Sequence, residues 1–222
     1  MNILLSHPRS GNTWLRYYLE YVSLRPSHTG DINQANNTDL EKAAVGKKLI
    51  PGLNCKKRAI CTKRHHIHLP KDEWTGKESI ILIVRDYKEC ILKHLSPKMR
   101  TENLLKENIR GYTRLLRYYD EHKGKKILVY YEDLMTHPRK ELSRIKDFLD
   151  LDDKRHNEFM DNYNEHKEKM LKHYHGGKVR FSSRGEKFKF HQRMAESTTI
   201  NSLKSEIRIY RALYNKYLKR YA

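Results

Sequence analysis

The chain has 222 residues and a mass of 26.7 kDa, enough to bury a sizeable core, and we expect residues 1–222 to form a single domain. Its 46 Lys and Arg residues exceed its 27 Asp and Glu residues, which gives a formal net charge of +19. This charge favours anionic partners and excludes an acidic, anion-repelling surface. It does not choose between a nucleic acid, a membrane surface, an acidic glycan and a charged nucleotide.

The cysteines and the hydropathy pattern bear on the compartment. Cys55, Cys61 and Cys90 form no C-x-x-C pair, and an odd number leaves at least one thiol unpaired. Reduced thiols are typical of the cytoplasm, so we expect a cytoplasmic location. No apolar run approaches membrane-spanning length, and Met1 leads almost directly into the first predicted strand. We therefore expect neither a transmembrane segment nor a cleaved signal.

Taken in chain order, the predicted elements alternate between strands and helices. Short apolar runs predict four strands, at residues 3–5, 58–62, 79–84 and 126–130. Apolar residues spaced three and four apart predict helices over residues 14–22, 102–122, 138–149 and 200–217. A further helix is expected from about residue 88, and residues 153–173 are helical by propensity although heavily charged. The alternation predicts an α/β fold, a central parallel β-sheet flanked by helices on both faces.

The segment Ser6–Trp14, which we call the first loop, joins the first predicted strand to the first predicted helix. A small-residue turn at such a junction leaves backbone N–H groups unpaired at the positive end of the helix dipole. Arg9 adds a permanent cation, Gly11 permits a tight turn and Thr13 supplies a hydroxyl. The loop therefore predicts a phosphate or sulfate site. A plain Gly-Asn turn with a solvated Arg9 is the simpler alternative.

The nucleotide-binding pattern G-x-x-x-x-G-K-[ST] is absent from the sequence. Instead, Pro8-Arg9-Ser10-Gly11-Asn12-Thr13-Trp14 resembles the P-[KR]-S-G-[TN]-T-W loop of sulfotransferases that use 3′-phosphoadenosine 5′-phosphosulfate (PAPS) and release 3′-phosphoadenosine 5′-phosphate (PAP). The resemblance implies a P-loop-like sulfotransferase fold. It also implies that the cofactor-binding residues include Arg9, Ser10, Gly11, Asn12 and Thr13 around the phosphosulfate, and Trp14 stacked on adenine.

A second anion site is predicted where the strand at residues 79–84 ends, because ligands gather at the carboxyl ends of parallel strands. Val84-Arg85-Asp86 resembles the family's V-x-R-[ND]-P segment, whose arginine binds the 3′-phosphate of the donor. Lys93 stands where the family has a serine, so either Lys93 or Ser96 takes that place. A surface salt bridge between Arg85 and Asp86 is the alternative interpretation.

A candidate base lies between the two anion sites. Lys63-Arg64-His65 resembles the family's K-[TS]-H segment at a strand end, which implies that His65 is catalytic. His68, which precedes Leu69-Pro70, is the alternative base. A metal site made with Asp72 and Glu73 is disfavoured, because zinc needs three or four ligands and no cysteine pair is nearby. We expect no metal.

Two further segments resemble the same family. Tyr131-Glu132-Asp133-Leu134 matches its Y-E-D-L, for which we expect a structural role. Arg184 and Gly185 match part of its R-K-G-x-x-G-D-W segment, which closes over the 3′-phosphate. This second match implies that residues 174–190 form a lid over the donor.

The resemblance implies in-line transfer of a sulfuryl group from PAPS to a hydroxyl or amine, with His65 as base and Arg9 stabilising the leaving phosphate. The basic charge favours an acidic or glycan-like acceptor. Two other functions stay open: a nucleotide or small-metabolite kinase with a divergent phosphate loop, and a basic nucleic-acid-binding protein. Binding of nucleic acid is the less expected, because the tyrosines fall on helix stripes typical of a core.

Overall fold

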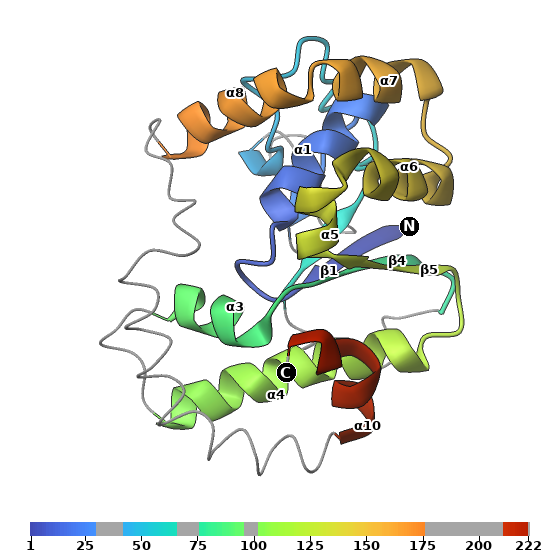
Figure 1. Cartoon of the computed structure of the whole chain (residues 1–222). Coiled ribbons are helices and arrows are strands. Elements are labelled where there is room, and N and C mark those ends of the chain that lie inside the picture. Colours follow the sequence, from blue (N-terminus) through green and yellow to red (C-terminus); the bar gives the residue numbers. More distant parts are fainter. Residues whose placement is uncertain (30–41, 66–75, 96–101, 176–210, 222) are drawn as a thin grey trace.

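The computed structural model describes residues 1–29, 42–65, 76–95, 102–175 and 211–221. These residues contain a five-stranded sheet in the order β2-β3-β1-β4-β5, and every neighbouring pair is parallel. The strands are β1 (Asn2–Ser6), β2 (His28–Thr29), β3 (Thr62–Arg64), β4 (Ser79–Val84) and β5 (Lys126–Tyr130). Helices lie on both sides of the sheet (Figure 1), which confirms the predicted α/β class.

β4 illustrates why the strands are apolar almost throughout. It lies between β1 and β5, so both of its faces are covered. Ile80, Leu82 and Val84 belong to one buried cluster, whereas Ile81 and Ile83 belong to the cluster on the opposite face. The alternation follows from the two-residue period of a strand.

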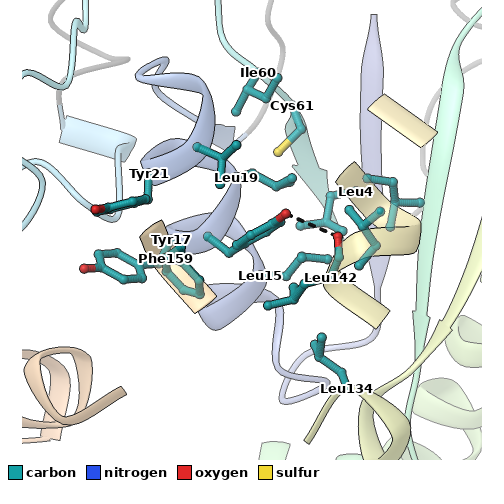
Figure 2. Close-up of a cluster of buried hydrophobic side chains, with 14 of the residues drawn as sticks. Leu4, Leu15, Tyr17, Leu19, Tyr21, Ile60, Cys61, Leu134, Leu142 and Phe159 are labelled. Atoms are coloured by element: carbon teal, nitrogen blue, oxygen red, sulfur yellow. Dashed lines mark hydrogen bonds between the residues drawn. The ribbon is translucent and has the colours of Figure 1, made fainter. Parts of the chain in front are cut away.

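One face of the sheet is covered by α1 (Asn12–Ser23), α5 (Tyr131–Thr136) and α6 (Pro138–Leu149). α7 (Asp153–Asp161) and α8 (Tyr163–His175) form a further layer beside α1 (Figure 1). Phe159 of α7 is fully buried and packs near Tyr17 and Tyr21 of α1 (Figure 2). Contacts between aromatic side chains therefore hold α7 against α1.

The other face is covered by α3 (Tyr87–His94), α4 (Glu102–Glu121) and the C-terminal segment, which runs from α10 (Arg211–Leu213) through a π-helix (Tyr214–Leu218) to a 3₁₀ turn (Lys219–Tyr221). Tyr217 and Leu218 are buried in the same cluster as Ile3 and Leu5 of β1. The chain end thus completes the core on this side.

The strand predicted at residues 58–62 is misplaced, because β3 covers Thr62–Arg64. Its register pairs Leu5 of β1 with Arg64, and the carboxyl tip of a strand can hold polar side chains. Ile60 and Cys61 instead bond to the preceding loop, with distances of 2.7 Å from the Ile60 N to the Pro26 O and 2.9 Å from the His28 N to the Cys61 O. This loop also forms β2, which the irregular composition of residues 25–57 does not predict.

Two predicted helices also differ from the structure. The helix expected over residues 153–173 is divided at Asn162, whose side-chain Nδ2 donates to the Glu158 carbonyl at 3.0 Å and whose own carbonyl accepts from the His166 N at 3.0 Å. The helix expected over residues 200–217 lies partly outside the described residues, and its described end is α-helical over Arg211–Leu213 and a π-helix over Tyr214–Leu218. No helix within the described ranges is both long and apolar enough to cross a membrane.

Candidate functional site

The topology brings four chain segments to one edge of the sheet. β1 and β4 are neighbours, but the chain leaves β1 toward β2 and β3 and leaves β4 toward β5. Such a reversal of strand order opens a ligand position beyond the carboxyl ends of the two strands. The first loop follows β1, His65 follows β3, Arg85 follows β4 and Tyr131 follows β5. The predicted site residues among these therefore share one edge.

The first loop has an unusual backbone. Arg9 and Gly11 both have positive φ, at 71° and 86°. A Cβ on Gly11 would lie 2.4 Å from Cδ2 of Tyr131, so the position excludes a side chain on two independent grounds. The sequence predicted that this turn needs glycine. Both the positive φ of Gly11 and the Tyr131 ring beside it impose that need.

The start of α1 presents open hydrogen-bond donors. Gly11 caps the helix without a side-chain hydrogen bond, and the first turn contains no acidic residue. The Gly11 carbonyl accepts from the backbone N atoms of Trp14 and Leu15, at 3.2 and 3.4 Å. Within the described part of the chain, no hydrogen bond engages the N–H groups of residues 11–13. Three amides and the positive end of the helix dipole are thus available to an anion.

The side chains of the first loop divide into two groups. Those of Arg9 and Thr13 are exposed, and among the described residues no carboxylate pairs with Arg9. Ser10 is fully buried with its Oγ 3.3 Å from Sγ of Cys90, and Asn12 donates from Nδ2 to Oγ of Ser6 at 3.1 Å. Ser10 and Asn12 therefore use their side chains to fasten the loop, which leaves Arg9 and Thr13 as the side chains directed to solvent.

Trp14 lies in an aromatic cluster. Its ring is partly buried and stacks on Tyr17 with centroids 5.9 Å apart, and it meets Tyr163 edge-on at 5.5 Å. The sequence motif predicted a contact between Trp14 and a nucleotide. It did not predict that Trp14 also packs α1 against α7 and α8.

His65 is held by the strand that leads into the first loop. Its Nδ1 lies 2.7 Å from the backbone O of Ser6. A carbonyl only accepts, so in the neutral ring Nδ1 carries the hydrogen and the basic lone pair is on Nε2. Asn12 binds the hydroxyl of the same Ser6. The candidate base and the first turn of α1 are therefore joined through one residue.

Lys63 is a site-edge residue to which the sequence analysis gave no role. It lies on β3 two residues before His65 and is half-buried. Burial, together with the nearby Arg16 guanidinium, lowers the pKa of the Lys63 ammonium. Sequence alone shows the position of Lys63 but not its burial.

Arg85 lies at the end of β4, as predicted, but its environment differs from the surface salt bridge with Asp86 that was the alternative interpretation. Its Nε and one terminal nitrogen donate to Glu89, at 2.9 and 2.6 Å. Its NH1 donates to the backbone O of Arg9 at 3.0 Å. Asp86 instead caps α3 by accepting from the Lys88 N at 2.9 Å. The pairing of Arg85 with Asp86 is therefore wrong, and the first loop and the second predicted anion site are in direct contact.

Lys93 reaches the same carboxylate as Arg85. Its Nζ donates to Oε1 of Glu89, one helical turn earlier on α3. The structure thus brings together both cations that the sequence associated with a 3′-phosphate. Glu89 lies between them, and no motif predicted that role for it.

The remaining candidates cannot be placed. His68, Asp72, Glu73, Ser96, Arg184 and Gly185 lie outside the described residues. Among the residues that are described, no three His, Cys, Asp or Glu side chains gather in a way that could hold a metal ion.

No protein-family model matches the chain. Solved structures do resemble it. Mouse sulfotransferase SULT7A1 in complex with PAP is 19% identical over 96% of this chain and 87% of that chain, with a TM-score of 0.54. A retinol dehydratase in complex with androsterone and PAP is 14% identical over 91% of this chain and 80% of that chain, with a TM-score of 0.53. The same enzyme with retinol and PAP is 13% identical over 91% and 81%, with a TM-score of 0.51. The chain therefore has the α/β fold of these PAP-binding proteins.

Proposed function

We propose that this protein is a sulfotransferase that binds PAPS at the first loop and transfers its sulfuryl group to an acceptor hydroxyl or amine. One observation carries the proposal. The exposed Arg9 and three unengaged amides of residues 11–13 surround the start of α1, and His65 is fixed on the strand that leads into them. An anion-binding turn beside an oriented base is the arrangement that this reaction requires.

The residues present fit a doubly phosphorylated nucleotide. The amides of residues 11–13, with Arg9 and Thr13, are the proposed contacts to its 5′ end. Arg85 and Lys93 are the proposed contacts to its 3′-phosphate, with Arg184 and Gly185 as further contacts. Trp14 is the proposed contact to adenine. PAPS supplies an activated sulfur atom bonded to a phosphate leaving group.

Proton transfer is assigned to His65. The acceptor oxygen or nitrogen forms a bond to sulfur while the bond between sulfur and the phosphate oxygen breaks, and that electron pair leaves with PAP. Nε2 of His65 takes the acceptor proton, while the Ser6 carbonyl on Nδ1 stabilises the resulting imidazolium. Arg9 and the loop amides stabilise the negative charge that grows on the phosphate. His68 is the alternative base.

The ligands of similar structures, the net charge and the cysteines bear on the acceptor and the compartment. Retinol and androsterone, found in the retinol dehydratase structures, are both alcohols, which supports a hydroxyl acceptor. The net charge of +19 favours an acidic or glycan-like molecule. Cys61 and Cys90 are buried thiols without a disulfide bond, which supports a cytoplasmic location.

Calorimetric titration and a transfer assay test the proposal together. We expect the wild-type protein to bind PAP, and His65→Ala to bind PAP unchanged while losing transfer from labelled PAPS to a panel of alcohols and amines. His173→Ala, at an exposed position on α8, is the matched control and should retain both. If His65→Ala keeps full turnover, His65 is not the base.

The same titration separates the other functions. Binding of ATP–Mg²⁺ without binding of PAP would favour a kinase. Salt-sensitive binding of random DNA without affinity for PAP would favour a nucleic-acid-binding protein. Either result would contradict the proposal.

A further inference from the structure

We infer that Arg85, Glu89 and Tyr131 form a brace behind the first loop, in which Glu89 is a positioning residue that holds Arg85 against the carbonyl of Arg9. The inference rests on the proposed function in one respect, that the first loop binds the 5′ end of the nucleotide. It assigns Arg85 a task in addition to its proposed contact with the 3′-phosphate.

Three of the five N–H donors of the Arg85 guanidinium are engaged within the protein. Nε and NH2 donate to the two oxygens of Glu89, and NH1 donates to the Arg9 O at 3.0 Å. The ring of Tyr131 covers one face of the guanidinium, with its centroid 4.1 Å from Cζ. Only 9% of the Arg85 side chain is exposed. Each nitrogen of Arg85 thus has a protein acceptor before any ligand binds.

The contacts of Arg85 and Tyr131 fall on the two residues of the first loop that have a left-handed backbone. Within the first loop, Arg9 and Gly11 are the residues with positive φ. Arg85 donates to the carbonyl of Arg9, and the Tyr131 ring lies against the position where a Cβ of Gly11 would be. Both left-handed residues of the loop are therefore contacted by the same unit. A non-glycine residue stays in this conformation only when its surroundings enforce it.

The Glu89 carboxylate also acts on Arg85 electrostatically. Burial alone would lower the pKa of Arg85, whereas the Glu89 carboxylate beside it raises that pKa overall. A bidentate arginine–carboxylate pair is also directional, which fixes the plane of the guanidinium. Without Glu89, the buried cation would lose two acceptors and turn toward solvent or another acceptor. The Arg9 carbonyl would then lose its donor.

The brace predicts an effect that a contact limited to the 3′-phosphate does not. Disturbing it should weaken ligands that lack a 3′-phosphate, because the 5′ site itself is deformed. The probes are PAP and adenosine 5′-monophosphate, which share the 5′-phosphate. The variants are Glu89→Gln, which keeps the size of the side chain, and Arg85→Lys, which keeps the charge but cannot reach Glu89 and Arg9 together.

We expect both variants to lose affinity for both nucleotides by about tenfold, the factor for one charge-assisted hydrogen bond. In the free protein, hydrogen–deuterium exchange should rise at the amides of Ser10, Trp14 and Leu15, which donate to the carbonyls of His7 and Gly11, and stay unchanged over β5. Glu141→Gln is the matched control, because Glu141 is also buried and paired with an arginine, Arg144 on α6. It should lower stability without altering exchange in the first loop.

Unchanged exchange at the amides of Ser10, Trp14 and Leu15 in a folded variant, or an affinity loss confined to PAP, would overturn the brace. If the wild-type protein binds neither nucleotide, the proposed function fails, and the exchange measurement still decides whether the brace exists.

Discussion

Arg9 combines an exposed cation with a backbone conformation that suits glycine. Its φ of 71° places a β-carbon in the left-handed region, which costs roughly 1 kcal/mol or more for a non-glycine residue. Strain of this kind persists at positions where the side chain is needed for function. The strain and the charge of Arg9 can be separated by two substitutions at the same position.

Arg9→Gly should raise the free energy of unfolding by about 1 kcal/mol, because the left-handed conformation no longer has a steric cost, while PAP binding weakens at least tenfold. Arg9→Ala removes the same guanidinium but keeps the strain, so it should weaken binding equally without the gain in stability. Urea unfolding and calorimetry measure the two effects. Wild-type affinity in Arg9→Gly would contradict a role for the guanidinium.

Gly11→Ala should destabilise the protein by several kcal/mol and abolish PAP binding, because the new methyl group meets Tyr131 at 2.4 Å and the φ of 86° stays unfavourable. The double variant Gly11→Ala with Tyr131→Ala removes the overlap but not the strained φ. The free energy of unfolding of the double variant should be higher than the value obtained by adding the separate effects of Gly11→Ala and Tyr131→Ala. Thermal unfolding of the four proteins provides this comparison.

Part of the candidate site could be predicted from residue types alone. How the other side chains of the loop are used depends on their burial. Arg9, Gly11 and Thr13 could be assigned from the motif, because charge, glycine and a hydroxyl at a strand–helix junction have direct chemical consequences. The inward direction of Ser10 and Asn12 depends on Cys90 and Ser6, which motif spacing does not encode. The link from Arg85 to Glu89 depends on the start of α3, whose first turn holds Glu89 beside a residue that precedes the helix.

At the scale of elements, the first loop is supported from below by α4. His7 is buried against the ring of Tyr112 on α4, with centroids 5.3 Å apart, and its Nδ1 lies 3.0 Å from the Pro8 carbonyl. Exposed His94 at the end of α3 meets the ring of His7 edge-on. A histidine preceding the phosphate motif gave no signal in the sequence, because its value lies in this packing.

The buried His7 predicts a loss of stability in acid. Burial lowers the pKa of His7 from 6.5 to about 4. The unfolded chain therefore takes up a proton near pH 6.5 that the folded chain refuses until about pH 4. This contribution is complete above pH 6.5 and is lost progressively as the pH falls toward 4. Buried His156 and His166, whose pKa values burial also lowers, act in the same direction.

His7→Asn should therefore flatten the pH dependence. Between about pH 7.5 and about pH 5, the wild-type free energy of unfolding should fall by about 2 kcal/mol more than that of the variant. His173→Asn, at an exposed position, is the control and should follow the wild-type curve. Parallel curves for His7→Asn and wild type would show that His7 is not neutral in the folded protein.

The C-terminal segment shows what periodicity can and cannot predict. The three-and-four spacing of its apolar residues predicted a helical, core-facing segment, which the structure confirms over the described residues 211–217. It did not predict the π-helix, which allows Tyr217 to donate to Asp120 at 2.5 Å while the Tyr217 carbonyl accepts from Tyr130 at 3.2 Å. Those two contacts belong to different elements, so local pattern could not anticipate them.

Leu218→Ala should lower the free energy of unfolding by about 2–3 kcal/mol, because Leu218 is buried in the same cluster as Ile3 and Leu5 of β1. Lys219→Ala, one residue later and exposed, should change it by less than about 0.5 kcal/mol. Urea unfolding measures both. Equal, small effects would mean that the C-terminal segment is not docked as the structure places it.

At the scale of the whole molecule, the sheet order and the site are one feature. The reversal between β1 and β4 places the first loop beside Arg85, and the parallel register brings His65 level with Ser6. The alternating pattern predicted a parallel sheet, but not its order, because strand order depends on which helices cover which face. The net charge of +19 is consistent with an anionic ligand but does not indicate where that ligand binds. The exposed position of Arg9 beside the start of α1 is what suggests the place.

A crystal structure of the protein with PAP tests the central claim most directly. We predict that the 5′-phosphate lies within hydrogen-bond distance of the backbone N atoms of residues 11–13, with the Arg9 guanidinium turned toward it. A nucleotide bound elsewhere, or a crystal in which PAP at saturating concentration leaves the start of α1 to solvent, would contradict the account.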